Sequence, residues 1–267
     1  MKNYRVPTLT IAGSDSSGGA GIQADLKTFS AIGTYGMSVI TAITAQNTEG
    51  VFDVEELSSE IIKSQIKAVC EDIPPKAIKI GMVSSPKIIK DIVESLEIYP
   101  CEYVVVDPVM ISKSGYSLLR PEAKENLIKY LIPMAYLVTP NVPEAEEITG
   151  IKIENVEDMK KAGKEILNLG PKYVLMKGGH LDGDAVDILM GENLFEVFSS
   201  ERINKKNTHG TGCTLSSAIT SHIALGYDVV EAVRLSKIYI TEAIRHSFDI
   251  GHGVGPVNHF YKFEKVD

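Results

Sequence analysis

The sequence of 267 residues has no tryptophan and only three cysteines. Cys70, Cys101 and Cys213 form no C-x-x-C pair and their number is odd, so we expect neither a disulfide framework nor a structural zinc site. No run of about 18 uninterrupted apolar residues is present, so no membrane-spanning helix is predicted. The sequence also lacks long charge blocks, Pro/Ser-rich linkers and internal repeats, and we expect one domain over residues 1–267.

Basic residues are in the minority. The chain has 27 Lys+Arg against 35 Asp+Glu, a net charge of −8, which argues against non-specific binding to nucleic acid or to an anionic membrane. A small basic pocket for an anionic ligand remains compatible with this balance. The apolar stretch near the N-terminus is broken early by Gly13 and Asp15, unlike a signal peptide. We therefore expect a cytoplasmic protein.

The sequence does contain a repeated alternation of short β-branched segments with longer amphipathic ones. Such alternation, with almost continuously apolar strands, predicts a three-layer α/β/α fold around a mostly parallel sheet, with residues 38–57 as a flap or an edge addition. The expected strands are Thr8–Ala12, Ser38–Ala45, Val51–Leu57, Ala77–Met82, Tyr103–Asp107, Ala135–Thr139 and Tyr173–Lys177, followed by a hairpin over 185–190 and 194–198. The expected helices are Gly21–Ile32, Glu60–Val69, Pro86–Leu96, Pro121–Leu131, Asn155–Leu169, Thr211–Leu225 and Asp228–Ser247.

Glycine-rich and polar segments follow several of these strands, where open α/β sheets bind their ligands. The first, GSDSSGGAG at 13–21, contains a G-x-G-x-x-A pattern starting at Gly19. A dinucleotide fold would use this pattern for a pyrophosphate, but the loop is long and no acidic residue ends the second strand. The second alternative is a flexible strand–helix connection without a binding role. We favour a substrate-binding loop anchored by Asp15 and Asp25.

A second segment, NTHGTGC at 207–213, runs directly into a predicted helix. Gly210, Thr211 and Gly212 allow backbone N–H groups to converge at the positive end of the helix dipole, which predicts an anion hole for a transferring phosphoryl group. Cys213 lies in the first turn, where the same dipole favours the thiolate. Ordinary helix capping is the alternative interpretation.

A third group of residues offers oxygen ligands and a cation. Asn141 and Glu144 in TPNVPE, together with Asp107 after YVVVD, are candidates to hold Mg²⁺ or its waters. Lys177 ends YVLMK and is a candidate phosphate ligand. For Asn141 and Glu144 the alternative is a capped helix start, and for Lys177 a surface position at a strand end.

Taken together, the motifs resemble those of the hydroxymethylpyrimidine/phosphomethylpyrimidine kinases, thiamine-pathway members of the ribokinase-like family. The resemblance covers nearly the whole chain. It is carried, in order, by IAGSDSSGGAGIQADLKTF, ITAQNTEGV, DPVMISKSG, TPNVPEAEEITG, KGGH, HGTGCTLSSAI and GHGVGPVNHFY.

The resemblance implies Mg²⁺-dependent transfer of phosphate from ATP to 4-amino-5-hydroxymethyl-2-methylpyrimidine and then to its monophosphate. Gln46 matches the residue that recognises the pyrimidine. The other implied substrate contacts are Gly13, Asp25, Met82 and Val109. Gly210, Thr211, Gly212 and Cys213 match the catalytic anion hole, Lys177, Asn141 and Thr139 are assigned to ATP and its phosphates, and Asp107 and Glu144 to the metal. A homodimer is the implied assembly.

Other functions remain open at this point. Most ribokinase-like sugar kinases carry Asp where this chain has Cys213, and the cysteine is shared with certain pyridoxal kinases. Pyridoxal or pyridoxine phosphorylation, alone or as a second activity, is therefore the alternative. A non-catalytic binding protein of the same fold is a further possibility, although its phosphate motifs would be expected to be degenerate. A dinucleotide oxidoreductase is supported only by the G-x-G-x-x-A match.

Overall fold

The computed structural model describes residues 5–110, 120–179 and 184–263. These residues form one nine-stranded sheet in the order β3-β2-β1-β4-β5-β6-β7-β8-β9. The strands are β1 (Pro7–Asp15), β2 (Tyr35–Gln46), β3 (Val51–Glu56), β4 (Ala77–Ile80), β5 (Val104–Val106), β6 (Leu137–Val138), β7 (Tyr173–Lys177), β8 (Ala185–Gly191) and β9 (Leu194–Ser200). The helices are α1 (Gly21–Ile32), α2 (Ser59–Asp72), α3 (Pro86–Ile98), α4 (Pro121–Asn126), α5 (Val142–Thr149), α6 (Val156–Leu167), α7 (Thr211–Ala224) and α8 (Val229–Arg245).

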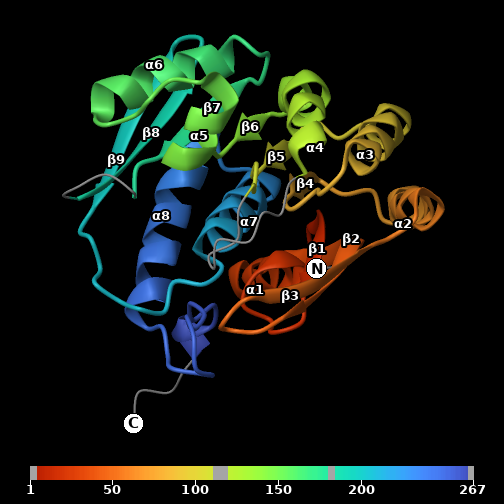
Figure 1. Cartoon of the computed structure of the whole chain (residues 1–267), viewed down its shortest axis with the longest axis horizontal. Helices are drawn as coiled ribbons and strands as arrows, with labels where there is room; N and C mark the ends of the chain where they lie inside the picture. Colours follow the sequence, from red (N-terminus) through yellow and green to blue (C-terminus); the bar gives the residue numbers. More distant parts are fainter. Residues whose placement is uncertain (1–4, 111–119, 180–183, 264–267) are drawn as a thin grey trace.

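The centre of the sheet is parallel and its edges are antiparallel. Strands β2, β1, β4, β5, β6 and β7 pair in parallel, whereas β3 is antiparallel to β2 and the β8–β9 hairpin is antiparallel to β7. The expectation of an edge addition around residues 38–57 is therefore confirmed. In Figure 1 the helices lie on both sides of the sheet, with α7 and α8 side by side.

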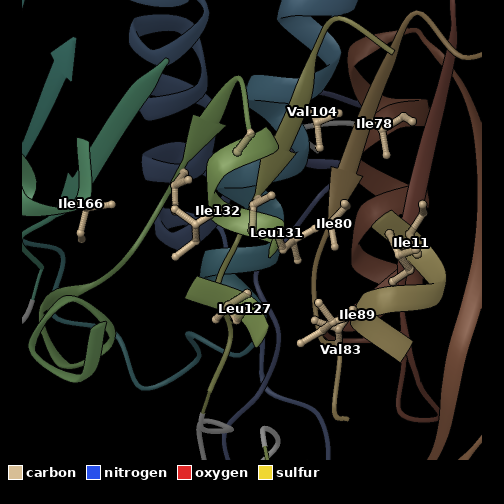
Figure 2. Close-up of a cluster of buried hydrophobic side chains, with 14 of the residues drawn as sticks. Ile11, Ile78, Ile80, Val83, Ile89, Val104, Leu127, Leu131, Ile132 and Ile166 are labelled. Atoms are coloured by element: carbon tan, nitrogen blue, oxygen red, sulfur yellow. The ribbon is translucent and has the colours of Figure 1, made fainter. Parts of the chain in front are cut away.

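Alternate residues of the central strands enter two different hydrophobic cores, because successive side chains of a strand point to opposite faces. Val104 and Val106 pack in the larger core with α2, α3 and α6, and Val105 packs in the smaller core with α7 and α8. Figure 2 shows part of the larger core, where Ile78 and Ile80 of β4 lie among residues from both strands and helices. Both faces of the sheet are thus covered, which confirms the predicted three-layer class.

One predicted helix and two predicted strands differ clearly in extent from those observed. The expected helix over 121–131 is α-helical only to Asn126 and continues as a π-helical turn at Leu127–Leu131 and a 3-10 turn at Ile132–Met134. The expected strands at 103–107 and 135–139 shorten to three and two residues. Single hydrogen bonds still extend these ladders, since Asp107 N donates to Ile80 O and Thr139 N to Val106 O. None of the described helices is long and apolar enough to cross a membrane.

Candidate active site

The carboxyl edge of the sheet brings together residues from three strands. Asp107 follows β5, Thr139 follows β6 and Lys177 ends β7. Lys177 Nζ donates to Asp107 Oδ1 at 2.8 Å, and Thr139 Oγ1 donates to the same oxygen at 3.1 Å. Ser216 Oγ on α7 donates to Asp107 Oδ2 at 3.3 Å. Asp107 is therefore held between the sheet and α7, as its position after a central strand predicts.

The charged groups at this edge shift one another's pKa values. Burial acts to raise the pKa of Asp107, but Lys177 and Lys79 outweigh it and keep that pKa below its ordinary value. For Glu144, burial dominates and raises the pKa to about 7, with Lys177 opposing and Asp107 adding to the effect. Lys177 Nζ lies 4.0 Å from Glu144 Oε2. The ammonium group therefore lies between two buried carboxyl groups, one ionised and one poised to titrate near neutral pH.

Asn141 and Glu144 form a capping box at the start of α5. Asn141 Oδ1 accepts from Glu144 N at 2.9 Å, and Glu144 Oε2 accepts from Asn141 N at 2.8 Å. The capped-helix interpretation of these two residues is thus realised in the structure. Thr139 is fully buried and its hydroxyl donates to Asp107, while its assignment to ATP or phosphate binding stays a prediction.

The N-terminus of α7 has the features of an anion hole. Gly210 is the N-cap with φ 80°, and no side chain caps the helix. A Cβ at Gly210 would lie 1.9 Å from the Gly19 carbonyl oxygen, so only glycine fits against the β1–α1 loop there. Gly212 faces the ion pair, since a Cβ on it would lie 3.6 Å from both Asp107 Oδ2 and Lys177 Nζ. The first-turn N–H groups of α7, which have no intrahelical acceptor, therefore lie close to the Lys177 ammonium group.

Cys213 lies in the first turn of α7 as a free thiol. Burial raises its pKa to about 11, and the nearby carboxylates Asp25 and Asp107 add to this, while Lys79 and the Gly21 N–H oppose it. The sequence analysis expected the helix dipole to favour the thiolate. In the structure burial outweighs the favourable groups, and the thiol is protonated at neutral pH.

Asp25, assigned from the sequence to the substrate pocket, lies in a buried ion pair, and its contact with substrate stays a prediction. Its side chain is fully buried and its oxygens accept from Lys79 Nζ at 2.9 and 3.0 Å, Thr10 Oγ1 at 2.6 Å and Ser217 Oγ at 2.7 Å. Lys79 is also fully buried. The sequence could not reveal this ion pair, because Lys79 stands inside an apolar strand motif. Asp25 links α1, β1, β4 and α7 directly beneath the first turn of α7.

The predicted apolar substrate residues lie at neighbouring strand ends. Gly13 in β1 contacts Met82, since a Cβ on Gly13 would lie 2.9 Å from Met82 Sδ. Thr41 Oγ1 donates to the Met82 carbonyl at 3.1 Å. Val109 is half-buried, and its N–H donates to the Asp107 carbonyl at 2.8 Å. The structure thus brings Gly13 next to Met82, and places Val109 in the turn that follows Asp107.

At the end of β2, Gln46 meets a histidine that the sequence analysis did not single out. Gln46 Nε2 lies 3.3 Å from His209 Nε2, and His209 Nε2 lies 2.9 Å from Asp15 Oδ2. A cavity of about 310 Å³ opens beside His209, between the β1–α1 loop and the segment around residues 248–256. His209 immediately precedes Gly210 in HGTGC, and that position was the signal available in the sequence. Ile111–Gly115 of DPVMISKSG and His180 of KGGH lie outside the described residues.

A mostly parallel sheet with an anion hole, a cation and two carboxyl groups at its carboxyl edge defines the class of ribokinase-like small-molecule kinases. A family model described as phosphomethylpyrimidine kinase matches residues 15–258. The chain belongs to the hydroxymethylpyrimidine/phosphomethylpyrimidine kinase family, as the resemblance of its motifs predicted.

Individual relatives agree with this assignment. The chain is 46% identical over 254 residues to the hydroxymethylpyrimidine/phosphomethylpyrimidine kinase of Bacillus subtilis, with 94% of each chain covered. It is similar to the crystal structure of a phosphomethylpyrimidine kinase from Clostridium difficile 630, with 74% identity, a TM-score of 0.82, and 90% of this chain and 100% of that chain covered. It is also similar to a Staphylococcus aureus pyridoxal kinase in complex with AMP-PCP and pyridoxal, at 38% identity and a TM-score of 0.88, with 96% and 94% covered.

Proposed function

We propose that residues 1–267 form one kinase domain that phosphorylates 4-amino-5-hydroxymethyl-2-methylpyrimidine and then its monophosphate, with ATP as the donor, in thiamine biosynthesis. The observation that carries the proposal is the approach of Lys177 and Asp107 to the first turn of α7, next to Cys213. Phosphoryl transfer requires positioned N–H groups and cations around a phosphate, and this arrangement supplies them. The family membership supports the choice of acceptor.

Within this proposal the N–H groups of Gly212 and Cys213 bind the transferring phosphoryl group. Thr211 shapes the turn, since its hydroxyl donates to the Thr208 carbonyl at 2.8 Å. Lys177 offsets the phosphate charge, and Asn141 sets the start of α5 beside it. Cys213 lies next to the acceptor hydroxyl. Because its thiol is protonated in the free protein, it gains basic character only to the extent that bound substrates lower its pKa.

Mg²⁺ is the metal that fits this site. Asp107 and Glu144 supply hard carboxylate oxygens on either side of Lys177, and no third carboxyl, histidine or cysteine among the described residues joins them as a metal-binding group. Mg²⁺ is commonly held by one or two carboxylates together with water and substrate phosphates. When bound, the ion would neutralise phosphate charge. Glu144 would then be held ionised, although alone its pKa is raised to about 7.

At the other end of the site we assign the pyrimidine ring to Gln46, with Gly13, Met82 and Val109 as the apolar surroundings. The Gln46 amide offers one donor side and one acceptor side, which complement the ring nitrogen and amino group of an aminopyrimidine. Gln46 ends β2, and its neighbours Asn47 and His209 line the cavity described above. We also propose that the protein acts in the cytoplasm and as a homodimer, the latter testable by light scattering.

Pyridoxal phosphorylation is the second candidate activity. The similarity to pyridoxal kinases of Bacillus subtilis and Staphylococcus aureus, at 40% and 38% identity, favours it as a side activity. The deciding experiment is a coupled ADP-release assay with the pyrimidine alcohol, its monophosphate and pyridoxal as acceptors. We expect both pyrimidines to have higher kcat/KM values than pyridoxal. ADP release with pyridoxal alone would overturn the proposal.

A further inference from the structure

The backbone of Gln46 is fixed, so that only its side-chain amide is left to be oriented. Ser16 Oγ donates to the Gln46 carbonyl at 2.8 Å, and the Gln46 N–H donates to Ser16 Oγ at 2.9 Å. The amide itself has two polar neighbours, Thr44 Oγ1 at 3.2 Å and His209 Nε2 at 3.3 Å. These two neighbours decide which end of the amide carries the oxygen.

Thr44 requires a donor from Gln46. Thr44 Oγ1 lies within donating distance of the Ser14 carbonyl at 2.9 Å and of Gln46 Oε1 at 3.2 Å, and its single proton goes to the nearer oxygen, that of Ser14. What Thr44 Oγ1 has left for Gln46 is a lone pair. The amide end at Thr44 is therefore the NH₂ group, which is the orientation obtained by exchanging the amide nitrogen and oxygen about the last side-chain bond.

His209 requires an acceptor from Gln46. Asp15 Oδ2 lies 2.9 Å from His209 Nε2, and a carboxylate oxygen approaches that closely only where Nε2 carries a proton. Burial acts to raise the pKa of Asp15, but hydrogen bonds from His209 and Ser17 lower it to about 2, so the carboxylate is ionised. The Nε2–H of His209 is thus given mainly to Asp15, and a protonated Nε2 has no lone pair for a Gln46 N–H. The Gln46 end facing it at 3.3 Å is therefore the carbonyl oxygen, which shares the same proton. Both neighbours demand the same orientation.

We propose that His209 is a positioning residue for substrate specificity: anchored by Asp15, it holds the Gln46 amide in one orientation and so fixes the order of donor and acceptor presented to the substrate ring. This inference rests on the proposed function, in which Gln46 reads the aminopyrimidine. With one N–H on Thr44 and one oxygen lone pair on His209, the second N–H and the second lone pair remain for the ring. A freely rotating amide would present the reversed order half of the time.

The surroundings of His209 hold its ring in place. A Cβ on Gly19 would lie 2.3 Å from His209 Cδ2, so the ring packs against the β1–α1 loop where only glycine leaves room. On the chain itself, His209 N donates to the Gly255 carbonyl at 3.0 Å, and Val257 N donates to the His209 carbonyl at 3.4 Å. The residue is 8% exposed. Its ring is therefore a fixed reference for the Gln46 side chain.

The test is a double-mutant cycle with steady-state kinetics for the pyrimidine alcohol. His209→Leu removes the N–H donor, and losing one hydrogen bond is expected to raise the pyrimidine KM about five- to tenfold, with kcat and the ATP KM within about twofold. His209→Gln keeps a donor and should restore most of the lost affinity. In the Gln46→Leu background His209→Leu should have no further effect on KM, because the interaction partner is gone. His246→Leu, an exposed histidine that does not line this cavity, is the matched control.

Three results would overturn the inference. One is an unchanged pyrimidine KM in His209→Leu while Gln46→Leu raises it. Another is a rise in the pyrimidine KM on His209→Leu that is equally large with and without Gln46. The third is a loss confined to kcat or to ATP affinity, which would mean that His209 acts through the neighbouring Gly210. If Gln46→Leu itself leaves the pyrimidine KM unchanged, the assigned role of Gln46 fails instead. Should thermal melts show His209→Leu unfolded, Thr44→Val removes the other anchor of the amide and carries the same expectation.

Discussion

At the scale of single residues, Cys213 tests the chemistry of the proposed transfer. The attacking hydroxyl must lose its proton, and a positioned base typically contributes about 10²–10⁴-fold, less where the transition state is loose. We expect Cys213→Ala to lose much but not all of kcat, with ATP binding kept, and Cys213→Asp to retain more activity than Cys213→Ala. Measurement of kcat for both variants, with thermal melts as a folding control, checks this. A silent Cys213→Ala and a harmful Cys213→Asp would mean that the thiol only packs beneath the anion hole.

The raised pKa of Cys213, about 11, gives this prediction a pH dependence. Below that value the thiolate fraction grows about tenfold per pH unit, so a thiolate base predicts that kcat/KM for the pyrimidine rises between pH 7 and 9. The rise should be absent in Cys213→Ala. Parallel profiles for the parent and the variant would remove Cys213 as the base.

The carboxylate of Glu144 is a second single group whose proposed role can be tested by substitution. If Glu144 holds Mg²⁺ or its waters, Glu144→Gln should raise the Mg²⁺ concentration needed for half-maximal activity, because an uncharged amide binds the ion less well. The glutamine keeps the oxygen that accepts from Asn141 N, so the start of α5 is preserved. A titration curve that overlays that of the parent protein would leave Glu144 with its capping role alone.

At the scale of elements, the carboxyl group of Glu144 at the start of α5 makes the stability of the folded protein depend on pH. Its pKa in the folded protein is raised from 4.5 to about 7, so the folded state binds a proton more readily than the unfolded chain. The corresponding stability is fully present below pH 4.5 and is lost as pH rises through about 7. Without Mg²⁺ and ATP, the melting temperature of Glu144→Gln relative to the parent should therefore increase from pH 5 to pH 8. A constant difference would contradict the raised pKa.

The buried pair of Lys79 and Asp25 joins β4 to α1, with Ser217 of α7 as a third partner. Removing one partner leaves an unpaired buried charge, so Lys79→Met should cost about 3–5 kcal/mol of unfolding free energy, measured by denaturant titration. The double variant Lys79→Met/Asp25→Asn removes both charges and should recover a large part of this loss. Its pyrimidine KM should match that of the parent. A raised KM in the folded double variant would support the contact of Asp25 with substrate.

These two residues show where prediction from sequence ended. Strand and helix periodicity predicted the layers, and the positions of Asp107 and Lys177 after parallel strands placed both at one edge of the sheet. The ion pair between them was not predicted and is seen in the structure. The partners of Asp25 depended on a lysine 54 positions away in an apolar strand, and no local pattern encodes that pairing. His209 likewise reaches Asp15 across 194 positions. Contacts set by local periodicity were predictable, whereas side-chain pairs between distant loops were not.

At the scale of the whole molecule, the site divides into a phosphate end at α7 and a ring end at β2. The phosphate end serves any acceptor, so Cys213→Ala should lower kcat for the pyrimidine alcohol and for pyridoxal in parallel. The ring end reads only the aminopyrimidine. Replacing Gln46 with Leu leaves that buried edge unpaired, which should cost about 1–3 kcal/mol of binding.

We therefore expect Gln46→Leu to raise the pyrimidine KM by about five- to 150-fold with little change in the ATP KM. Pyridoxal does not present the same amino and ring-nitrogen pair, so its KM should change much less. The ratio of kcat/KM for pyrimidine over pyridoxal, measured in one ADP-release assay, isolates the ring end because the phosphate end is common to both reactions. If the KM values of both acceptors rise by the same factor, Gln46 supports the site as a whole. An unchanged pyrimidine KM would mean that other residues recognise the ring.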